Sequence, residues 1–148
     1  MALNTGKVVA GGLAAGVVLN LIDYVVYTMV LVDRVKAEAN AFHPGMADSM
    51  MSGNAITVYI ITDFIFGLLL VWTYAAIRPR FGPGPRTAML AAFLFWIVLA
   101  FCNAGMMLMG MTSANLWWTE LFINLVNFLI ASWVGAMIYK ESGEGAAA

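Results

Sequence analysis

Four apolar stretches, each long enough to cross a lipid bilayer, occupy most of this 148-residue chain. They lie at about residues 8–32, 55–77, 87–111 and 116–139. A membrane-spanning helix needs about 20 mainly apolar residues. Only 10% of the residues are charged, whereas soluble domains carry about a quarter. The sequence therefore predicts an all-α membrane protein with one domain, residues 1–148, folded as an antiparallel bundle of four transmembrane helices.

The first apolar stretch is too long for the hydrophobic region of a cleavable signal, so we expect it to be retained. The connection at residues 33–54 is the longest and holds most of the loop charge. Its first part, up to Phe42, is predicted to continue the first helix into water. His43, Pro44 and Gly45 are then expected to break that helix, and residues 46–51 to form a short interfacial turn.

The second connection, residues 78–86, contains three prolines and two glycines. This composition predicts that the whole segment forms a compact, non-helical turn. Pro85 is expected at the start of the third helix, where the missing N–H has no cost. The third connection, residues 112–115, is very short and predicts a helical hairpin.

The basic residues are distributed unevenly between the two sides of the membrane. Lys7, Arg78, Arg80, Arg86 and Lys140 fall on one side, and Arg34 and Lys36 on the other. The positive-inside rule places the more basic side, with both termini, in the cytoplasm. Residues 33–54 then form the outer loop. Arg78, Arg80 and Arg86 are candidate ligands for lipid headgroups, or they serve topology alone.

Each apolar stretch contains one polar residue at a similar calculated depth, namely Asp23, Asp63, Asn103 and Asn124. Counted from the predicted helix centres, they lie about 4–6 Å toward the outside. Carboxylates inside a membrane are expensive and normally have a partner or a function. No membrane lysine or arginine is available to pair with the two aspartates, so we expect them to be protonated or to hold a cation.

Helical spacing places further polar residues beside these four. The first helix carries one such face, which is expected to point into the bundle and comprises Gly12, Gly16, Asn20, Asp23, Tyr24 and Tyr27. The fourth helix carries Glu120, Asn124 and Asn127 on one face. The predicted ion or proton site comprises Asp23, Asp63, Asn103, Asn124, Asn20, Tyr27, Tyr59 and Glu120. Three interpretations of these polar residues remain open. They form hydrogen bonds that hold helices together, each contributing about 0.6 kcal/mol, or they form a proton or cation site, or they form a docking surface for another membrane subunit.

Methionines are frequent in the outer half of the chain, and thioether and imidazole groups suit Cu(I). His43, Met46, Met50 and Met106 are therefore a lesser candidate metal site, against the simpler interpretation that methionine fills gaps in packing. No catalytic or cofactor-binding motif is present, so we expect neither an enzyme nor a bound cofactor. The net charge of −1 gives no basic footprint for nucleic acid.

The central segment YAAIRPRFGPGPRTA, residues 74–88, resembles the central turn of small bacterial four-helix integral membrane proteins of unassigned activity. The opening VVAGGLAAG, residues 8–16, and the ending YKE, residues 139–141, resemble theirs as well. The resemblance covers most of the chain, and its motifs are structural. It implies a four-helix architecture in a bacterial cytoplasmic membrane and implies no activity.

These observations predict a non-enzymatic, multi-pass protein of the bacterial inner membrane. We expect a homo-oligomer or an accessory subunit of a larger membrane complex, with the lipid bilayer and other membrane subunits as partners. The first alternative is a small proton- or cation-coupled transporter that uses Asp23 and Asp63. The second is copper handling on the periplasmic side by the methionine and histidine residues.

Overall fold

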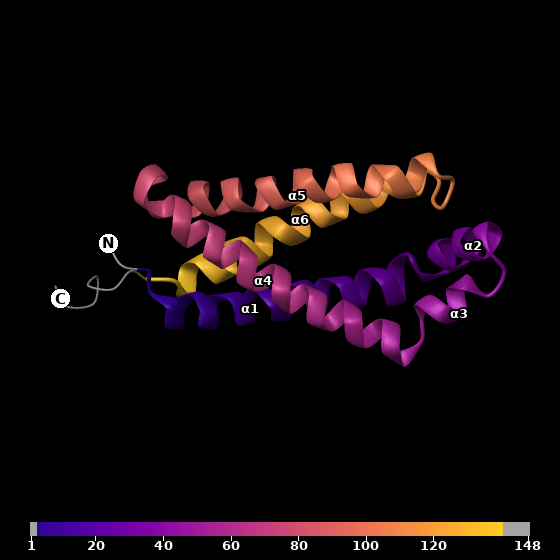
Figure 1. Cartoon of the computed structure of the whole chain (residues 1–148), viewed down its shortest axis with the longest axis horizontal. Helices are drawn as coiled ribbons and strands as arrows, with labels where there is room; N and C mark the ends of the chain where they lie inside the picture. Colours follow the sequence, from indigo (N-terminus) through magenta and orange to yellow (C-terminus); the bar gives the residue numbers. More distant parts are fainter. Residues whose placement is uncertain (1–2, 141–148) are drawn as a thin grey trace.

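The computed structural model describes residues 3–140, and every regular element in that range is helical (Figure 1). The elements are α1 (Thr5–Val25), the π-helix η1 (Val26–Val30), α2 (Val32–Phe42), α3 (Met46–Met50), α4 (Gly53–Phe81), α5 (Pro85–Leu108) and α6 (Ala114–Ile138). The expectation of an all-α chain is confirmed for this part of the protein.

Four helical segments are long and apolar enough to cross a membrane: Thr5–Val30, Gly53–Phe81, Pro85–Leu108 and Ala114–Ile138. They match the four predicted stretches, with ends shifted by up to four residues. Most of their large apolar side chains are exposed on the outside of the molecule, as expected where lipid replaces water as the solvent.

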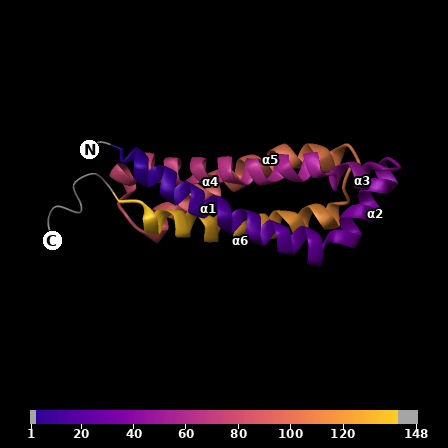
Figure 2. The ribbon, with the colours of Figure 1, turned by 90° about the horizontal axis from the view of Figure 1, so that it is seen from below.

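The four long helices run along the long axis of the molecule (Figures 1 and 2). Helix α1 packs against α4 and α6, and α5 packs against α6 and α4. The described chain begins and ends at the same end of the molecule, which we call the terminal end. Helices α2 and α3 lie at the opposite end, which we call the loop end.

Glycines bring the backbones of α1 and α4 into direct contact. A Cβ added to Gly12 would lie 2.7 Å from the Cα of Leu68, and one added to Gly16 would lie 2.8 Å from the Cα of Phe64. Gly67 faces the backbone of both Gly12 and Gly16. This is the small-residue packing that allows close helix crossings in membranes, and it agrees with the predicted interior face of the first helix.

Small residues also fill the interface between α5 and α6. Ala88, Ala91 and Ala92 of α5 are fully buried, as is Ala131 of α6. The hydroxyl of Ser132 donates a 2.8 Å hydrogen bond to the carbonyl oxygen of Ala88. The helices are therefore most closely packed toward the terminal end.

The prediction that residues 78–86 form a turn throughout is wrong at its first half. Helix α4 continues through Pro79 to Phe81, and only Gly82–Gly84 form the turn. A proline within a helix removes one backbone hydrogen bond, and this loss is tolerated near a helix end, where few bonds follow. Gly82 and Gly84, with φ of 83° and 120°, provide the reversal. Pro85 begins α5 as predicted.

The connection at residues 33–54 has the predicted parts, with one difference. Helix α2 ends at Phe42, and α3 follows the break at His43–Gly45, where Gly45 has φ of 83°. However, α2 does not continue α1 directly. The π-helix η1 and Leu31 separate them, and the Leu31 N–H donates to the carbonyl oxygen of Val26, five residues earlier.

Candidate functional site

Tyr27 lies at the centre of the polar residues in the loop-end half of the molecule. Its hydroxyl is within hydrogen-bonding reach of the Asn124 side chain on α6. The carboxylates of Glu120, Asp23 and Asp63 are close enough to interact with it electrostatically. These residues come from η1, α6, α1 and α4, so the fold brings together groups from three of the four spanning segments.

Tyr27 lies within the π-helix η1. A single π-turn adds one residue to a helical turn, and such turns occur frequently at functional sites. Because η1 begins directly after α1, the turn changes the register between Asp23 and the residues that follow. The prediction of one interior face was based on uninterrupted α-helical spacing through residues 23–30. Tyr24, predicted on the same interior face, lies in α1 just before the π-turn and is 60% exposed.

Asp23 is held by a residue from the far end of the chain. The side-chain amide of Asn127 donates a 2.7 Å hydrogen bond to Oδ1 of Asp23, joining α6 to α1. Asn127 is only 2% exposed. Its Oδ1 is also buried and has no hydrogen-bond partner among the described residues. That oxygen can therefore accept a further hydrogen bond or contact a cation.

Asp63 and Glu120 are partly buried and, within residues 3–140, accept no hydrogen bond. A charged side chain at membrane depth normally pairs with another group or faces a water-filled space. Among residues 3–140, Arg34 is the one basic residue that interacts electrostatically with these carboxylates, and it interacts with Glu120 from the loop end. Asp23 and Asp63 interact electrostatically with each other, and Glu120 interacts with Glu38 and Arg34. We call these three carboxylates, which lie around Tyr27, the acidic cluster.

The predicted common depth of the four polar residues is only approximate. Counted from the midpoints of the observed spans, Asp23, Asp63, Asn103 and Asn124 lie roughly 3–10 Å toward the loop end. All four are in the predicted half of the membrane-spanning region, but the spread is wider than the sequence indicated because the helix ends are shifted.

The remaining predicted site residues have different surroundings. Asn20 donates to the carbonyl oxygen of Gly16 at 2.9 Å and to that of Ile60 at 3.4 Å, so it links α1 to α4. Tyr59 is 50% exposed on the outer surface of α4. Asn103 is also exposed, although its spacing predicted an interior position, because α5 packs mainly through its alanine-rich half.

A small cavity of about 100 Å³ opens beside the acidic cluster. The residues around it include Tyr27, Asn103, Glu120 and Asn124 from the predicted set, together with Trp96 and Trp117. The Trp96 indole donates a 2.8 Å hydrogen bond to the carbonyl oxygen of Leu121, which fixes one wall. The indole N–H of Trp117 is buried without a hydrogen-bond partner among the described residues.

A second set of contacts closes the loop end. Glu38 of α2 accepts hydrogen bonds from the backbone N–H and hydroxyl of Ser113, at 2.7 and 2.6 Å, and from the hydroxyl of Thr112 at 3.2 Å. Arg34 donates to Asn115 at 2.8 Å. We call these contacts between α2 and the α5–α6 turn the outer latch.

The ionisation of Glu38 responds to these contacts. Partial burial disfavours the charged form of Glu38 and so raises its pKa. The hydrogen bonds from Ser113 and Thr112 and the positive charge of Arg34 have the larger, opposite effect, so the pKa of Glu38 is below its usual 4.5. The outer latch is therefore made by an ionised carboxylate at neutral pH.

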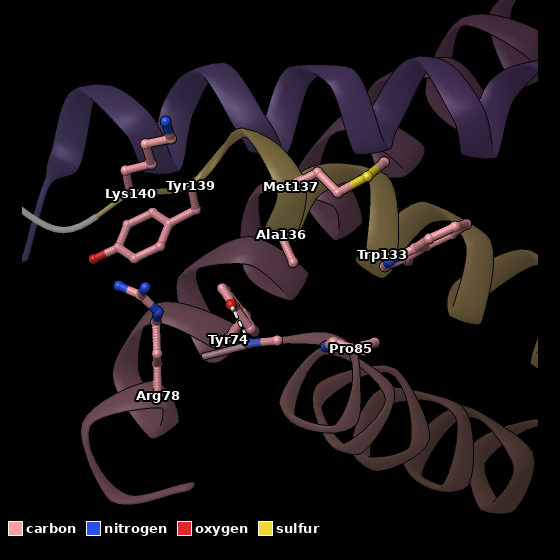
Figure 3. A pocket seen from close by; sticks show the side chains of 9 residues that line it. Tyr74, Arg78, Pro85, Trp133, Ala136, Met137, Tyr139 and Lys140 are labelled. Atoms are coloured by element: carbon pink, nitrogen blue, oxygen red, sulfur yellow. Dashed lines mark hydrogen bonds between the residues drawn. The ribbon is translucent and has the colours of Figure 1, made fainter. Parts of the chain in front are cut away.

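The three arginines predicted to contact lipid headgroups lie at the terminal end. Arg78 is 7% exposed and lies over the ring of Tyr139, with 5.7 Å from its guanidinium carbon to the ring centroid. Arg80 and Arg86 are exposed. A larger cavity, about 460 Å³, adjoins Arg78 but neither of the other two (Figure 3).

The candidate copper ligands are spread over separate elements. His43 is exposed between α2 and α3, Met46 and Met50 lie on α3, and Met106 is exposed on α5. Among the described residues, no group of three or more histidine, cysteine or acidic side chains could hold a metal ion.

Two features were not predicted as part of the site. Asn127 lies on the polar face of α6 seen in the sequence, but only the structure pairs it with Asp23. The outer latch joins residues more than 70 positions apart, and neither its glutamate nor its serine has a distinctive sequence pattern. No protein-family model matches the chain, and no curated protein or solved structure shows significant similarity to it.

Proposed function

We propose that the four spanning helices form an antiparallel bundle in a bacterial inner membrane, with the terminal end in the cytoplasm. Lys7, Arg78, Arg80, Arg86 and Lys140 lie at that end, and Arg34 and Lys36 at the loop end. The positive-inside rule supports this orientation. The outer latch and the acidic cluster then face the periplasmic half of the membrane.

We propose that the protein has a non-enzymatic role and binds a proton or a small cation at the acidic cluster. The observation that carries this proposal is the meeting of Asp23, Asp63 and Glu120 around Tyr27. Asp23 and Asp63 would repel each other if both were ionised, and each would lose hydration at this depth. A proton or a cation bound by these two carboxylates lowers both costs.

The surrounding groups suit such an ion. Asn124 and the free Oδ1 of Asn127 are neutral oxygen ligands or hydrogen-bond partners. The small cavity is lined by Glu120, Tyr27 and Asn124, so it offers space for an ion or for water beside these groups. Coupled transport requires uptake of the ion on one side of the membrane and its release on the other, and we propose that Asp23 and Asp63 bind the ion between these two steps in a small proton- or cation-coupled transporter.

Infrared difference spectroscopy of the protein in liposomes tests ion binding without a known substrate. Titration with acid, or with Na⁺ or K⁺, should change the carboxyl stretching bands of the intact protein. Asp63→Asn should remove part of that change, whereas Asp48→Asn, which alters an exposed carboxylate outside the spanning segments, should not. If Asp63→Asn and Asp48→Asn give the same spectra, the proposal is wrong.

A second candidate function is supported by the outer surface of α5. The loop-end half of α5 is poorly covered by the other helices: Phe101 is 76% and Leu108 82% exposed on one face. The Asn103 side chain, on another face, is exposed and lines the small cavity. An exposed amide at membrane depth lacks a hydrogen-bond partner, and a neighbouring transmembrane helix would supply one. This favours a homo-oligomer or an accessory subunit of a larger complex. Native mass spectrometry in mild detergent tests it, because Asn103→Leu should then reduce the assembled species.

A further inference from the structure

The small cavity beside the acidic cluster is lined by more than oxygen ligands. The residues around it are Tyr27 of η1, Trp96, Leu99, Ala100 and Asn103 of α5, and Trp117, Glu120, Leu121 and Asn124 of α6. Most of these side chains are aromatic or aliphatic. The volume is about 100 Å³, whereas about 10–15 Å³ is enough for one water molecule. The cavity therefore has room for a small organic molecule.

The cavity carries negative charge. Glu120 is the one charged side chain among its described lining residues. Arg34 interacts electrostatically with Glu120 but does not line the cavity, and its guanidinium donates a 2.8 Å hydrogen bond to Asn115. Glu38, which has the opposite charge, acts on Glu120 more strongly than Arg34 does. A ligand in this space is therefore favoured if it is a cation.

Two indole rings of the cavity are held in place. The Trp96 N–H donates a 2.8 Å hydrogen bond to the carbonyl oxygen of Leu121, and the centroid of its ring lies 5.3 Å from that of Phe93. The ring of Trp117 packs edge-on against Trp118, with 4.6 Å between centroids. Aromatic rings attract ammonium groups, because the ring face carries partial negative charge. Walls that are already fixed bind a ligand with less loss of side-chain freedom.

One polar group of the cavity lining has no partner. The indole N–H of Trp117 is buried and donates no hydrogen bond to a described residue. A buried donor without an acceptor is unfavourable, and an oxygen atom on a ligand would accept this hydrogen bond. Trp117 and Glu120 are three positions apart on α6, so they share one face of that helix and one small ligand reaches both.

We propose that this cavity binds a small organic ammonium ion that carries an oxygen atom close to its charged nitrogen. Glu120 pairs with the ammonium group, the indole rings contact its carbon atoms, and the Trp117 N–H donates to its oxygen. A metal ion would use the carboxylate and amide oxygens alone and would leave the indole N–H without an acceptor. The inference rests on the proposed transport function: the organic cation is the substrate, and the proton or cation at Asp23 and Asp63 is the coupling ion.

Isothermal titration calorimetry of the full chain tests the proposal with choline as the probe. The protein is purified in a maltoside detergent, which has no choline headgroup. Choline carries an ammonium group and a hydroxyl, whereas its neutral analogue dimethylbutanol has a carbon atom in place of the ammonium nitrogen. The intact protein should bind choline about tenfold more tightly than dimethylbutanol. This comparison needs no variant, and equal affinities would overturn the proposal.

Two pairs of variants locate the site. Glu120→Gln should bind choline about tenfold more weakly, because the paired charge is lost, and Asp48→Asn should bind it like the intact protein. Trp117→Phe keeps a ring but removes the N–H donor, so its choline affinity should fall by roughly three- to tenfold. Trp118→Phe makes the same change on a ring that does not line the cavity and should have no effect. Equal choline affinities in Glu120→Gln and Asp48→Asn would show that the proposed site is wrong.

This proposal and the proposed function fail separately. The infrared titration depends on Asp63, which does not line the cavity, and it uses no organic ligand. If the carboxyl bands change as expected but choline does not bind, the ion site stands and the organic cation is wrong. If choline binds through Glu120 and the carboxyl bands do not change, the cavity site stands and the coupling ion is wrong.

Discussion

Asn127 donates a 2.7 Å hydrogen bond to Asp23 across 104 residues of sequence and joins α6 to α1 at membrane depth. Both partners lie within membrane-spanning segments. The Asp23 carboxylate also interacts electrostatically with Tyr27. The contact leaves the side-chain oxygen of Asn127 buried and available.

Asn127→Ala should destabilise the protein by about 1–3 kcal/mol, because it removes the donor to Asp23 and leaves a buried acceptor unpaired. Asn103→Ala makes the same chemical change on the exposed surface of α5 and should have almost no effect on the monomer. Thermal unfolding of both variants in detergent, followed by circular dichroism, measures the difference. Equal melting temperatures would show that the Asp23–Asn127 contact contributes nothing to stability.

Gly67→Ala should separate α1 from α4. The added Cβ would meet the backbone of Gly12 and Gly16, which cannot move aside as a side chain can. Overpacking of this kind costs about 1–3 kcal/mol. Gly105→Ala on α5 is the matched control, because nothing lies within 4 Å of its added Cβ. Thermal stability in detergent is again the measurement, and a loss in Gly105→Ala as large as in Gly67→Ala would contradict the packing argument.

The outer latch should open on acidification. The pKa of Glu38 is lowered in the folded protein, so its contribution is complete above the usual value of 4.5 and is lost as the pH falls through the lowered value. Amide hydrogen exchange at Ser113 should therefore increase below about pH 4.5, beyond the intrinsic dependence on pH.

Glu38→Gln tests the cause of that change. The neutral amide should give faster hydrogen exchange at Ser113 at neutral pH. It should also remove the extra increase in the exchange rate at acidic pH. Asp48→Asn, on an exposed carboxylate of α3, should keep the behaviour of the intact protein. If hydrogen exchange at Ser113 in Glu38→Gln increased on acidification as much as in the intact protein, another group would control the outer latch.

The proposed orientation can be tested with single cysteines. In a Cys102→Ser background, Asp48→Cys should react with a membrane-impermeant maleimide added outside intact spheroplasts. Arg86→Cys should react only after the membrane is opened. Both positions are exposed, so access depends on the side of the membrane. The opposite labelling pattern would place the terminal end outside.

The sequence alone determined the four spanning helices, because the length and hydropathy of each segment depend on local composition. It also identified the glycine face of α1 and the acidic residues of the candidate site. Pro85 at the start of α5 and the break after Phe42 follow from the local effects of proline and glycine.

The tertiary structure decided which of these residues meet. The π-turn of η1 alters the register after Asp23, the alanines of α5 turn Asn103 outward, and α6 brings Asn127 to Asp23. Helix α4 also continues through Pro79, although local preference favours a turn there. Helical spacing places residues on a face of their own helix, but the pairing of faces depends on packing between distant segments. Such contacts have no signature in the local sequence.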